Sequence, residues 1–152
     1  MKLNEINSEQ FINIKIQNVF DFFSKPENLQ EITPKRLGFN IITPGPIEME
    51  KGTVIDYYIK ISYIPIRWRT IITNYNPPYK FVDQQIKGPY SFWHHTHTFS
   101  KLNGGTLIKD NIKYLVPFGI IGKIINKIWI KRDLENIFDY RKNKIKILLE
   151  RN

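Results

Sequence analysis

The sequence contains no cysteine and no long apolar run. Without cysteine the chain can form neither disulfide bonds nor thiolate metal sites, and it has no cysteine nucleophile. No apolar run approaches the roughly 20 residues that a membrane-spanning helix needs. The N-terminal segment MKLNEINSEQ is polar and lacks the apolar core of a signal peptide. We therefore expect a cytoplasmic protein.

Motifs for nucleotide binding and for common nucleophiles are also missing. Gly104-Gly105 reads as a hairpin turn rather than a phosphate-binding loop, and neither G-x-S-x-G nor H-E-x-x-H occurs. No repeat, linker or low-complexity segment divides the chain, so we predict a single domain over residues 1–152. We expect no tightly held cofactor, and we expect the chain to be a monomer or a weak dimer.

Acidic residues are scarce relative to basic ones. Lys and Arg number 23 against 14 Asp and Glu, which gives a formal net charge of +9. Such a balance suits a nucleic acid or an anionic membrane surface. The basic residues are scattered, however, and toward the C-terminus the lysines have the spacing of the solvated face of a helix. We therefore expect no nucleic-acid partner, and we keep peripheral membrane contact as an alternative.

Apolar periodicity predicts an α+β chain. A first strand over residues 9–14 precedes two short helices hinged at Pro26, because proline is tolerated at the start of a helix but not inside it. A strand at 37–43 follows. After Phe118 the apolar spacing becomes three and four, which predicts one long C-terminal helix with an apolar stripe. Between them, alternating residues predict an antiparallel meander with strands near 55–61, 67–75, 81–87, 91–100 and 106–114.

The segment FVDQQIKGPYSFWHHTHTF, residues 81–99, is the most informative part of the chain. Gly88-Pro89 predicts a turn between two strands. One face of the second strand carries Trp93, His95, His97 and Phe99. The facing strand offers Phe81, Asp83 and Gln85. A face that mixes large rings with buried polar groups suits a ligand cavity better than a sealed core.

Ordinary tight turns between the strands predict which inward residues are neighbours. They place Tyr57, Ile59 and Ile61 opposite Ile72, Thr70 and Trp68. Ile72 and Thr70 then lie near Asp83 and Gln85. Next, Asp83 faces His95, Gln85 faces Trp93, and His95 faces Asp110. The resulting row of Asp83, His95 and Asp110 is bordered by Thr70, Gln85, Trp93 and His97, and its charges supply their own partners.

Four interpretations of this polar row remain open. It is a structural belt of hydrogen bonds that fixes the sheet, or it orients a mostly apolar ligand between aromatic walls. It is an acid–base site, with His95 or His97 tuned by Asp83 or Asp110. Alternatively, the two histidines and the acids hold a metal, although i, i+2 spacing arises from alternation alone. We favour ligand orientation and assign no metal.

Five segments between about Phe11 and Arg141 carry a resemblance to a known superfamily. They are VFDFFSKPENLQEITP, IITPGPIEMEKGTVIDYYI, IPIRWRTIITNYNPPYKFVDQQIKGPYSFWHHTHTF, GGTLIKDNIKYLVPFG and KRDLENIFDYR. The sequence resembles the START-like, or helix-grip (SRPBCC), superfamily, in particular its bacterial polyketide cyclase/dehydrase-like ligand-binding group. The resemblance implies a curved antiparallel sheet of about six to seven strands wrapped around the C-terminal helix. It also implies two short helices after the first strand and a deep pocket.

Related proteins use that pocket for lipids, sterols, polyketides, plant hormones or quinones, and some catalyse cyclisation or dehydration. We therefore expect binding, transport or sequestration of a small hydrophobic or amphipathic molecule. One alternative is a cyclase or dehydratase whose catalytic candidates are His95, Asp83 and Asp110. Another is a lipid carrier that touches membranes through its basic helix and Ile120, Ile121, Ile124 and Ile125. The predicted ligand-binding residues are Tyr57, Trp68, Thr70, Asp83, Gln85, Trp93, His95, His97, Phe99, Asp110, Ile121 and Ile125.

Overall fold

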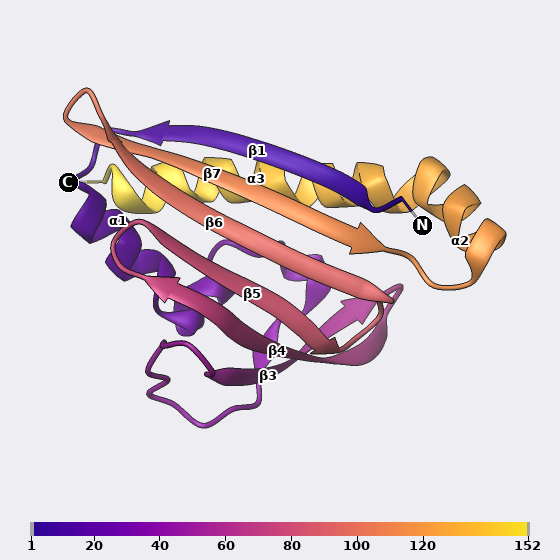
Figure 1. Ribbon diagram of the computed structural model, residues 1–152. Helices are drawn as coiled ribbons and strands as arrows, with labels where there is room; N and C mark the ends of the chain where they lie inside the picture. Colours follow the sequence, from indigo (N-terminus) through magenta and orange to yellow (C-terminus); the bar gives the residue numbers. More distant parts are fainter. Residues whose placement is uncertain (1, 152) are drawn as a thin grey trace.

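Alternation of apolar and polar residues produces one antiparallel sheet of seven strands in this protein. The computed structural model describes residues 2–151. Its sheet has the strand order β1-β7-β6-β5-β4-β3-β2 (Figure 1). The strands are β1 (Asn4–Ile12), β2 (Asn40–Ile41), β3 (Val54–Ile61), β4 (Ile64–Asn76), β5 (Lys80–Lys87), β6 (Phe92–Leu102) and β7 (Gly105–Leu115).

Short helices connect the first two strands, and a long helical segment ends the chain. The short helices are α1 (Ile16–Phe23), η1 (Pro26–Gln30) and η2 (Lys35–Leu37). The C-terminal segment consists of α2 (Gly119–Ile125), the π-helical turn η3 (Asn126–Ile130) and α3 (Lys131–Leu149). Figure 1 shows α3 running along the sheet behind β1 and β7. None of the helices among residues 2–151 combines the length and the apolar character needed to cross a membrane.

This architecture confirms the predicted α+β class, the curved sheet and the two short helices that meet at Pro26. The predicted strand at 37–43 is reduced to β2, because η2 occupies Lys35–Leu37 and Gly38 then takes a left-handed φ of 51°. The first strand begins at Asn4 rather than Glu9, since it pairs with β7 along its whole length. The single C-terminal helix is interrupted by η3, where the buried Asn126 accepts a hydrogen bond from Tyr114.

The predicted pairing of β3 with β4 was wrong. Tyr57 pairs with Trp68, four residues away from the expected Ile72. The hairpin turns at Ser62 and Tyr63, which have positive φ angles of 49° and 68°. A two-residue turn of this kind normally carries Asn or Gly. The sequence gives no such signal here, so the turn was placed too late in the chain.

Across the other strands the register was correct at two junctions and shifted at one. Thr70 pairs with Gln85 and Asp83 pairs with His95, as predicted. The ladder of β5 and β6 ends at Gln84–His94, so it does not include the predicted Gln85–Trp93 pair. The predicted register of β6 and β7 was wrong, since His97 rather than His95 pairs with Asp110 in the ladder, although the His95 side chain still reaches Asp110 Oδ1 at 2.7 Å. The wrong registers of β3–β4 and β6–β7 are each shifted by an even number of residues, so every side chain keeps its predicted face.

Two apolar clusters hold the sheet against its helices. The first surrounds α1, where the rings of Phe20, Phe81 and Phe99 pack edge to face or stacked. The second joins Trp68 and Trp93 to residues of α3. Burial of such side chains stabilises the fold by about 25 cal/mol for each Å² of apolar surface removed from water. Members of both clusters also form walls of a cavity between the sheet and the helices.

Candidate functional site

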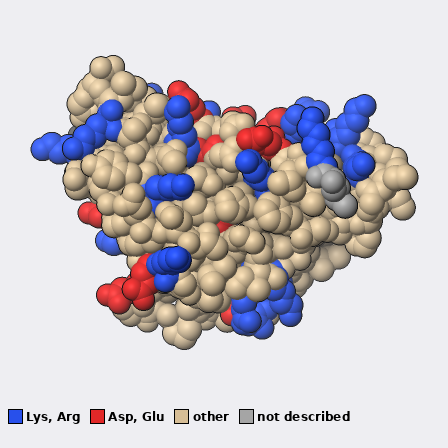
Figure 2. All heavy atoms as spheres, viewed as in Figure 1, with Lys and Arg blue, Asp and Glu red and all other residues tan. Residues whose placement is uncertain are grey.

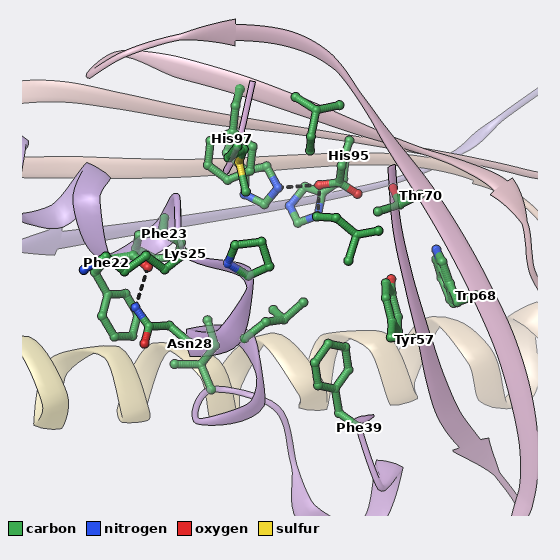
Figure 3. Close-up of a pocket in the computed structure, with 18 of the residues that line it drawn as sticks. Phe22, Phe23, Lys25, Asn28, Phe39, Tyr57, Trp68, Thr70, His95 and His97 are labelled. Carbon is green, nitrogen blue, oxygen red and sulfur yellow. Dashed lines mark hydrogen bonds and ion pairs between the residues drawn. The ribbon is translucent and has the colours of Figure 1, made fainter. Parts of the chain in front are cut away.

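Two adjoining chambers lie between the sheet and the helices. The inner chamber has a volume of about 160 Å³, and the outer chamber has a volume of about 320 Å³. Figure 3 shows Tyr57, Trp68 and Thr70 along one side of the inner chamber, with His95 and His97 pointing into it from the sheet. Residues that line both chambers are Leu29, Phe39, Tyr57, Trp68, Trp93, His95 and Arg141.

Aromatic rings form most of the wall that the two chambers share. Tyr57 stacks on Trp68 at a centroid distance of 5.8 Å, and Trp68 meets Trp93 edge to face at 5.2 Å. The ring of Phe39 leans on Tyr57 at 4.8 Å. Such rings offer a large apolar surface with few conformations to lose, which is typical of pockets for small apolar molecules.

Two histidines and two aspartates form a buried polar group beside the inner chamber, which we call the His–Asp cluster. His95 and His97 alternate inward on β6 between Asp83 on β5 and Asp110 on β7. His95 Nε2 lies 2.7 Å from Asp110 Oδ1, and His97 Nε2 lies 2.7 Å from Asp83 Oδ2. His97 Nδ1 is also 3.0 Å from Asp110 Oδ1. The two imidazole rings are tilted against each other at 3.7 Å.

Burial and the neighbouring charges give the two histidines opposite pKa shifts. Burial lowers the pKa of His97, but hydrogen bonds to Asp110 and Asp83 outweigh it, so the pKa of His97 is raised. Burial and repulsion by His97 together lower the pKa of His95. Burial opposes ionisation of Asp83 and Asp110, yet their histidine partners hold the pKa of both carboxyls below the usual value. The directions of these shifts favour an imidazolium at His97 between two carboxylates, with a neutral His95.

Asp83, His95 and His97 also have the composition of a metal site. One ligand atom from each lies within 4.8 Å of the other two. A metal needs deprotonated imidazole nitrogens. Here the Nε2 atoms face carboxylates at hydrogen-bonding distance, and the pKa of His97 is raised. The geometry suits a proton shared within the cluster better than it suits a cation.

No protein-family model matches the sequence, and no curated protein matches it at a significant level. Solved structures do match. The Zhui aromatase/cyclase from Streptomyces sp. R1128 has a TM-score of 0.78 at 10% identity, over 99% of this chain and 95% of that chain. Protein CV1439 from Chromobacterium violaceum has a TM-score of 0.75 at 11% identity, over 98% and 99%. A START superfamily protein from Mycobacterium smegmatis has a TM-score of 0.71 at 12% identity, over 95% and 98%.

The chain has the START-like fold. The resemblance noted in the sequence is thereby confirmed for the architecture. Identities this low carry the fold and leave the activity to be argued from the site itself.

Within the START-like fold most of the predicted site residues come together. Those that line the inner chamber are Tyr57, Trp68, Thr70, Asp83, Trp93, His95 and His97. Ile125 lies on the outer chamber. Asp110 lies behind the histidines, in contact with both rings but outside either chamber wall.

Three predicted residues lie away from the chambers. Gln85 turns to the β5–β6 loop, where its amide donates to the Tyr90 carbonyl at 2.7 Å and so fixes the turn. Phe99 is fully buried in the cluster around α1. Ile121 points to solvent, because the C-terminal segment leaves the sheet at α2; within α2 the outer chamber is reached at Ile125.

Sequence reasoning missed Arg141, which was not among the predicted site residues. It lines both chambers. The signal was present in the spacing, since Leu134, Phe138 and Ile145 form the buried stripe of α3. Position 141 continues that stripe at a spacing of three from Phe138 and four from Ile145. A cation on the apolar face of a helix needs a functional explanation.

Proposed function

We propose that this chain binds one small hydrophobic or amphipathic molecule in the two chambers. The observation that carries the proposal is the unfilled volume between the sheet and α3, walled by Tyr57, Trp68 and Trp93. Close-packed cores leave few voids larger than a water molecule. Empty space of this size beneath intact secondary structure therefore supports a ligand site. The likeness to an aromatase/cyclase and to a START superfamily protein supports the same proposal.

The His–Asp cluster gives this cavity a polar end. An apolar ligand gains affinity from burial and takes its orientation from a few polar groups. Thr70 cannot donate its hydroxyl hydrogen to a ligand without losing a bond, because that hydroxyl already donates to the Gln84 carbonyl at 3.0 Å. His95 lines both chambers, and its Nδ1 makes no hydrogen bond within residues 2–151. It is thus the cluster member that best orients a ligand.

Titration with the neutral fluorophore 1-aminoanthracene tests the proposal. We expect saturable binding at one site that decanol displaces. Replacing Ile59 or Ile137, which line the outer chamber, with Trp should weaken binding about tenfold or more, since added volume fills the site. Ile86→Trp is the matched control, because Ile86 is exposed and lies on neither chamber. Equal binding by all variants, or no binding by the native protein, would refute the proposal.

A second candidate function is acid–base catalysis on a bound carbonyl compound, as in a polyketide cyclase or dehydratase. It is favoured by the lowered pKa of His95, whose Nε2 is fixed by Asp110 at 2.7 Å, while its Nδ1 makes no hydrogen bond within residues 2–151 and lies 3.7 Å from Asp83 Oδ2. This arrangement resembles a base held by its orienting group. His95→Gln separates the two functions: a binding protein keeps its affinity for 1-aminoanthracene. An enzyme loses turnover of a synthetic triketide thioester by about two orders of magnitude or more.

Peripheral contact with an anionic membrane is supported by the surface of α2 and η3. Large apolar side chains are exposed there, among them Phe118 and Ile120 at 76% and Ile128 at 73%. Lys123 and Lys127 stand between them. Figure 2 shows Lys and Arg side chains beside uncharged atoms at the end of the molecule that carries α2. Apolar side chains flanked by lysines complement the negative surface of a bilayer.

This apolar and basic surface adjoins the outer chamber, because Phe118 and Ile125 also line that chamber. A ligand could therefore pass between the bilayer and the cavity. Co-sedimentation with vesicles of phosphatidylcholine and phosphatidylglycerol tests the contact at low salt. We expect binding to these vesicles, weaker binding to phosphatidylcholine alone, and loss in Ile120→Glu. The control Ile86→Glu should bind normally. Absence of sedimentation by the native protein would exclude the contact.

A further inference from the structure

Arg141 is a cation inside the cavity that has no acidic partner. It forms no ion pair with any carboxylate of residues 2–151, whereas Arg36 pairs with Asp133 at 2.6 Å and Arg69 pairs with Asp56 at 2.8 Å. Its guanidinium lies over the ring of Phe138, with Cζ 5.5 Å from the ring centroid. Arg141 is thus held in place on α3 by an aromatic ring while its charge remains available.

The nearest acids are already engaged. Asp83 senses the positive charge of Arg141, which helps to lower the pKa of that carboxyl. Asp83 and Asp110 both accept hydrogen bonds from the histidines, however, and neither lies within ion-pair distance of Arg141. The imidazolium of His97 offsets part of their charge. Two carboxylates against one imidazolium leave the cluster with a net negative charge, so an additional anion in the cavity depends on Arg141 for its counter-charge.

Two buried hydrogen-bond donors without acceptors also indicate a ligand that carries acceptor oxygens. Nε of Arg141 and Nε1 of Trp68 are both buried and find no partner within the described chain. Both side chains line both chambers. A buried donor that lacks an acceptor costs about 1–3 kcal/mol, so such groups in a folded protein call for an explanation. A ligand that brings acceptor oxygens to these side chains would offer both donors a partner once either side chain shifts enough to expose its donor atom.

We propose that Arg141 anchors the carboxylate of an amphipathic ligand whose apolar part fills the chambers. This inference rests on the proposed ligand-binding function and narrows its ligand class. The planar guanidinium matches the two oxygens of a carboxylate, with charge-assisted hydrogen bonds that neutral head groups cannot form. Trp68 on β4 contributes a further donor, since its side chain also lines both chambers. A cationic amphipathic ligand is disfavoured, because its charge would be repelled by the guanidinium of Arg141.

Displacement of 1-aminoanthracene by decanoate, decanol and decylamine tests the inference. The native protein should bind decanoate about tenfold more tightly than decanol, and decylamine most weakly. Arg141→Met keeps the apolar stem and should abolish the preference for decanoate over decanol. Arg141→Lys should retain part of the preference. Arg132→Met removes an exposed arginine of the same helix and should change nothing.

A second readout reports on the other donor. In proton–nitrogen correlation spectra, decanoate should shift the indole signal of Trp68 downfield in the native protein, while decanol should not. A Trp68→Phe variant identifies that signal among the three tryptophans.

The possible outcomes separate the inference from the function on which it rests. If 1-aminoanthracene binds but decanoate and decanol displace it equally, the anchoring role of Arg141 is refuted and the ligand-binding function stands. Preservation of the decanoate preference in Arg141→Met refutes the anchoring role as well. If neither the fluorophore nor any alkyl compound binds, the ligand-binding function itself fails. The comparison of the three alkyl compounds on the native protein needs no variant.

Discussion

The opposite pKa shifts of His95 and His97 predict how His95 responds when His97 is replaced. The two rings are 3.7 Å apart, and both contact Asp83 and Asp110. The raised pKa of His97 and the lowered pKa of His95 favour placing the proton on His97, whose positive charge disfavours protonation of His95. Replacing His97 with Gln removes the competing charge and leaves both carboxylates in place. His95 should then become the protonated member of the cluster.

The size of the effect follows from the separation of the rings. Two unit charges 3.7 Å apart repel by about 4 kcal/mol at an effective dielectric constant of about 20. One pKa unit corresponds to about 1.4 kcal/mol, so removing this repulsion should raise the apparent pKa of His95 by roughly two to three units. Because the two sites are coupled, the native protein should show two separated macroscopic titrations.

Nuclear magnetic resonance of the imidazole nitrogens, followed between about pH 4 and pH 9, measures both titrations directly. His94→Gln is the control, since His94 stacks on Phe92 on the opposite face of β6 and should not affect His95. Circular dichroism verifies that each variant is folded. A shift of the His95 titration by less than about half a unit in His97→Gln would show that the cluster does not share a proton as described.

Two further predictions concern stability. Because the pKa values of Asp83 and Asp110 are lowered on folding, their contribution is present above the unfolded value of about 4 and is lost as pH falls below it. Urea titrations should show the free energy of unfolding falling by about 1 kcal/mol for each carboxylate between pH 5 and pH 3, and Asp110→Asn should flatten that dependence; an unchanged slope would contradict the shift. In the second, Tyr114→Phe removes the hydroxyl that donates to Asn126 Oδ1 at 2.7 Å in a buried position, and should lower the free energy of unfolding by about 1–3 kcal/mol. Tyr63→Phe, at a residue 95% exposed, should change it by less than about 0.5 kcal/mol, and equal effects of both variants would refute the reasoning.

Strand faces were predictable from the sequence because alternation fixes them independently of the turns. Asp83, His95 and His97 were expected on one face and lie there, even though two of the hairpin registers were wrong. The wrong register of β3 and β4 traces to a turn without a clear chemical signal, whereas β6 and β7 turn at Asn103-Gly104, a two-residue turn of a type that the sequence does signal. Ser62 and Tyr63 adopt positive φ angles that residues of these types rarely prefer. Local preference therefore gave no indication of where that hairpin turns.

The C-terminal segment shows the opposite case. Its isoleucines predicted one continuous buried stripe, but a helical period says only which residues share a face. Whether that face meets the sheet depends on where the segment leaves it. Here α2 extends beyond the sheet (Figure 1), and Ile121 is exposed, while residues of α3 line the chambers.

The sequence by itself determined the order of the elements, the inward faces of the strands and the presence of imidazoles and carboxylates among tryptophans. These features depend on periods of two and 3.6 residues, which are local properties of the chain. Only the tertiary structure decided that His97 rather than His95 faces Asp110, and that Arg141 joins the cavity wall. Those relations arise from turn geometry and from how α3 lies on the sheet, and packing between distant segments sets both.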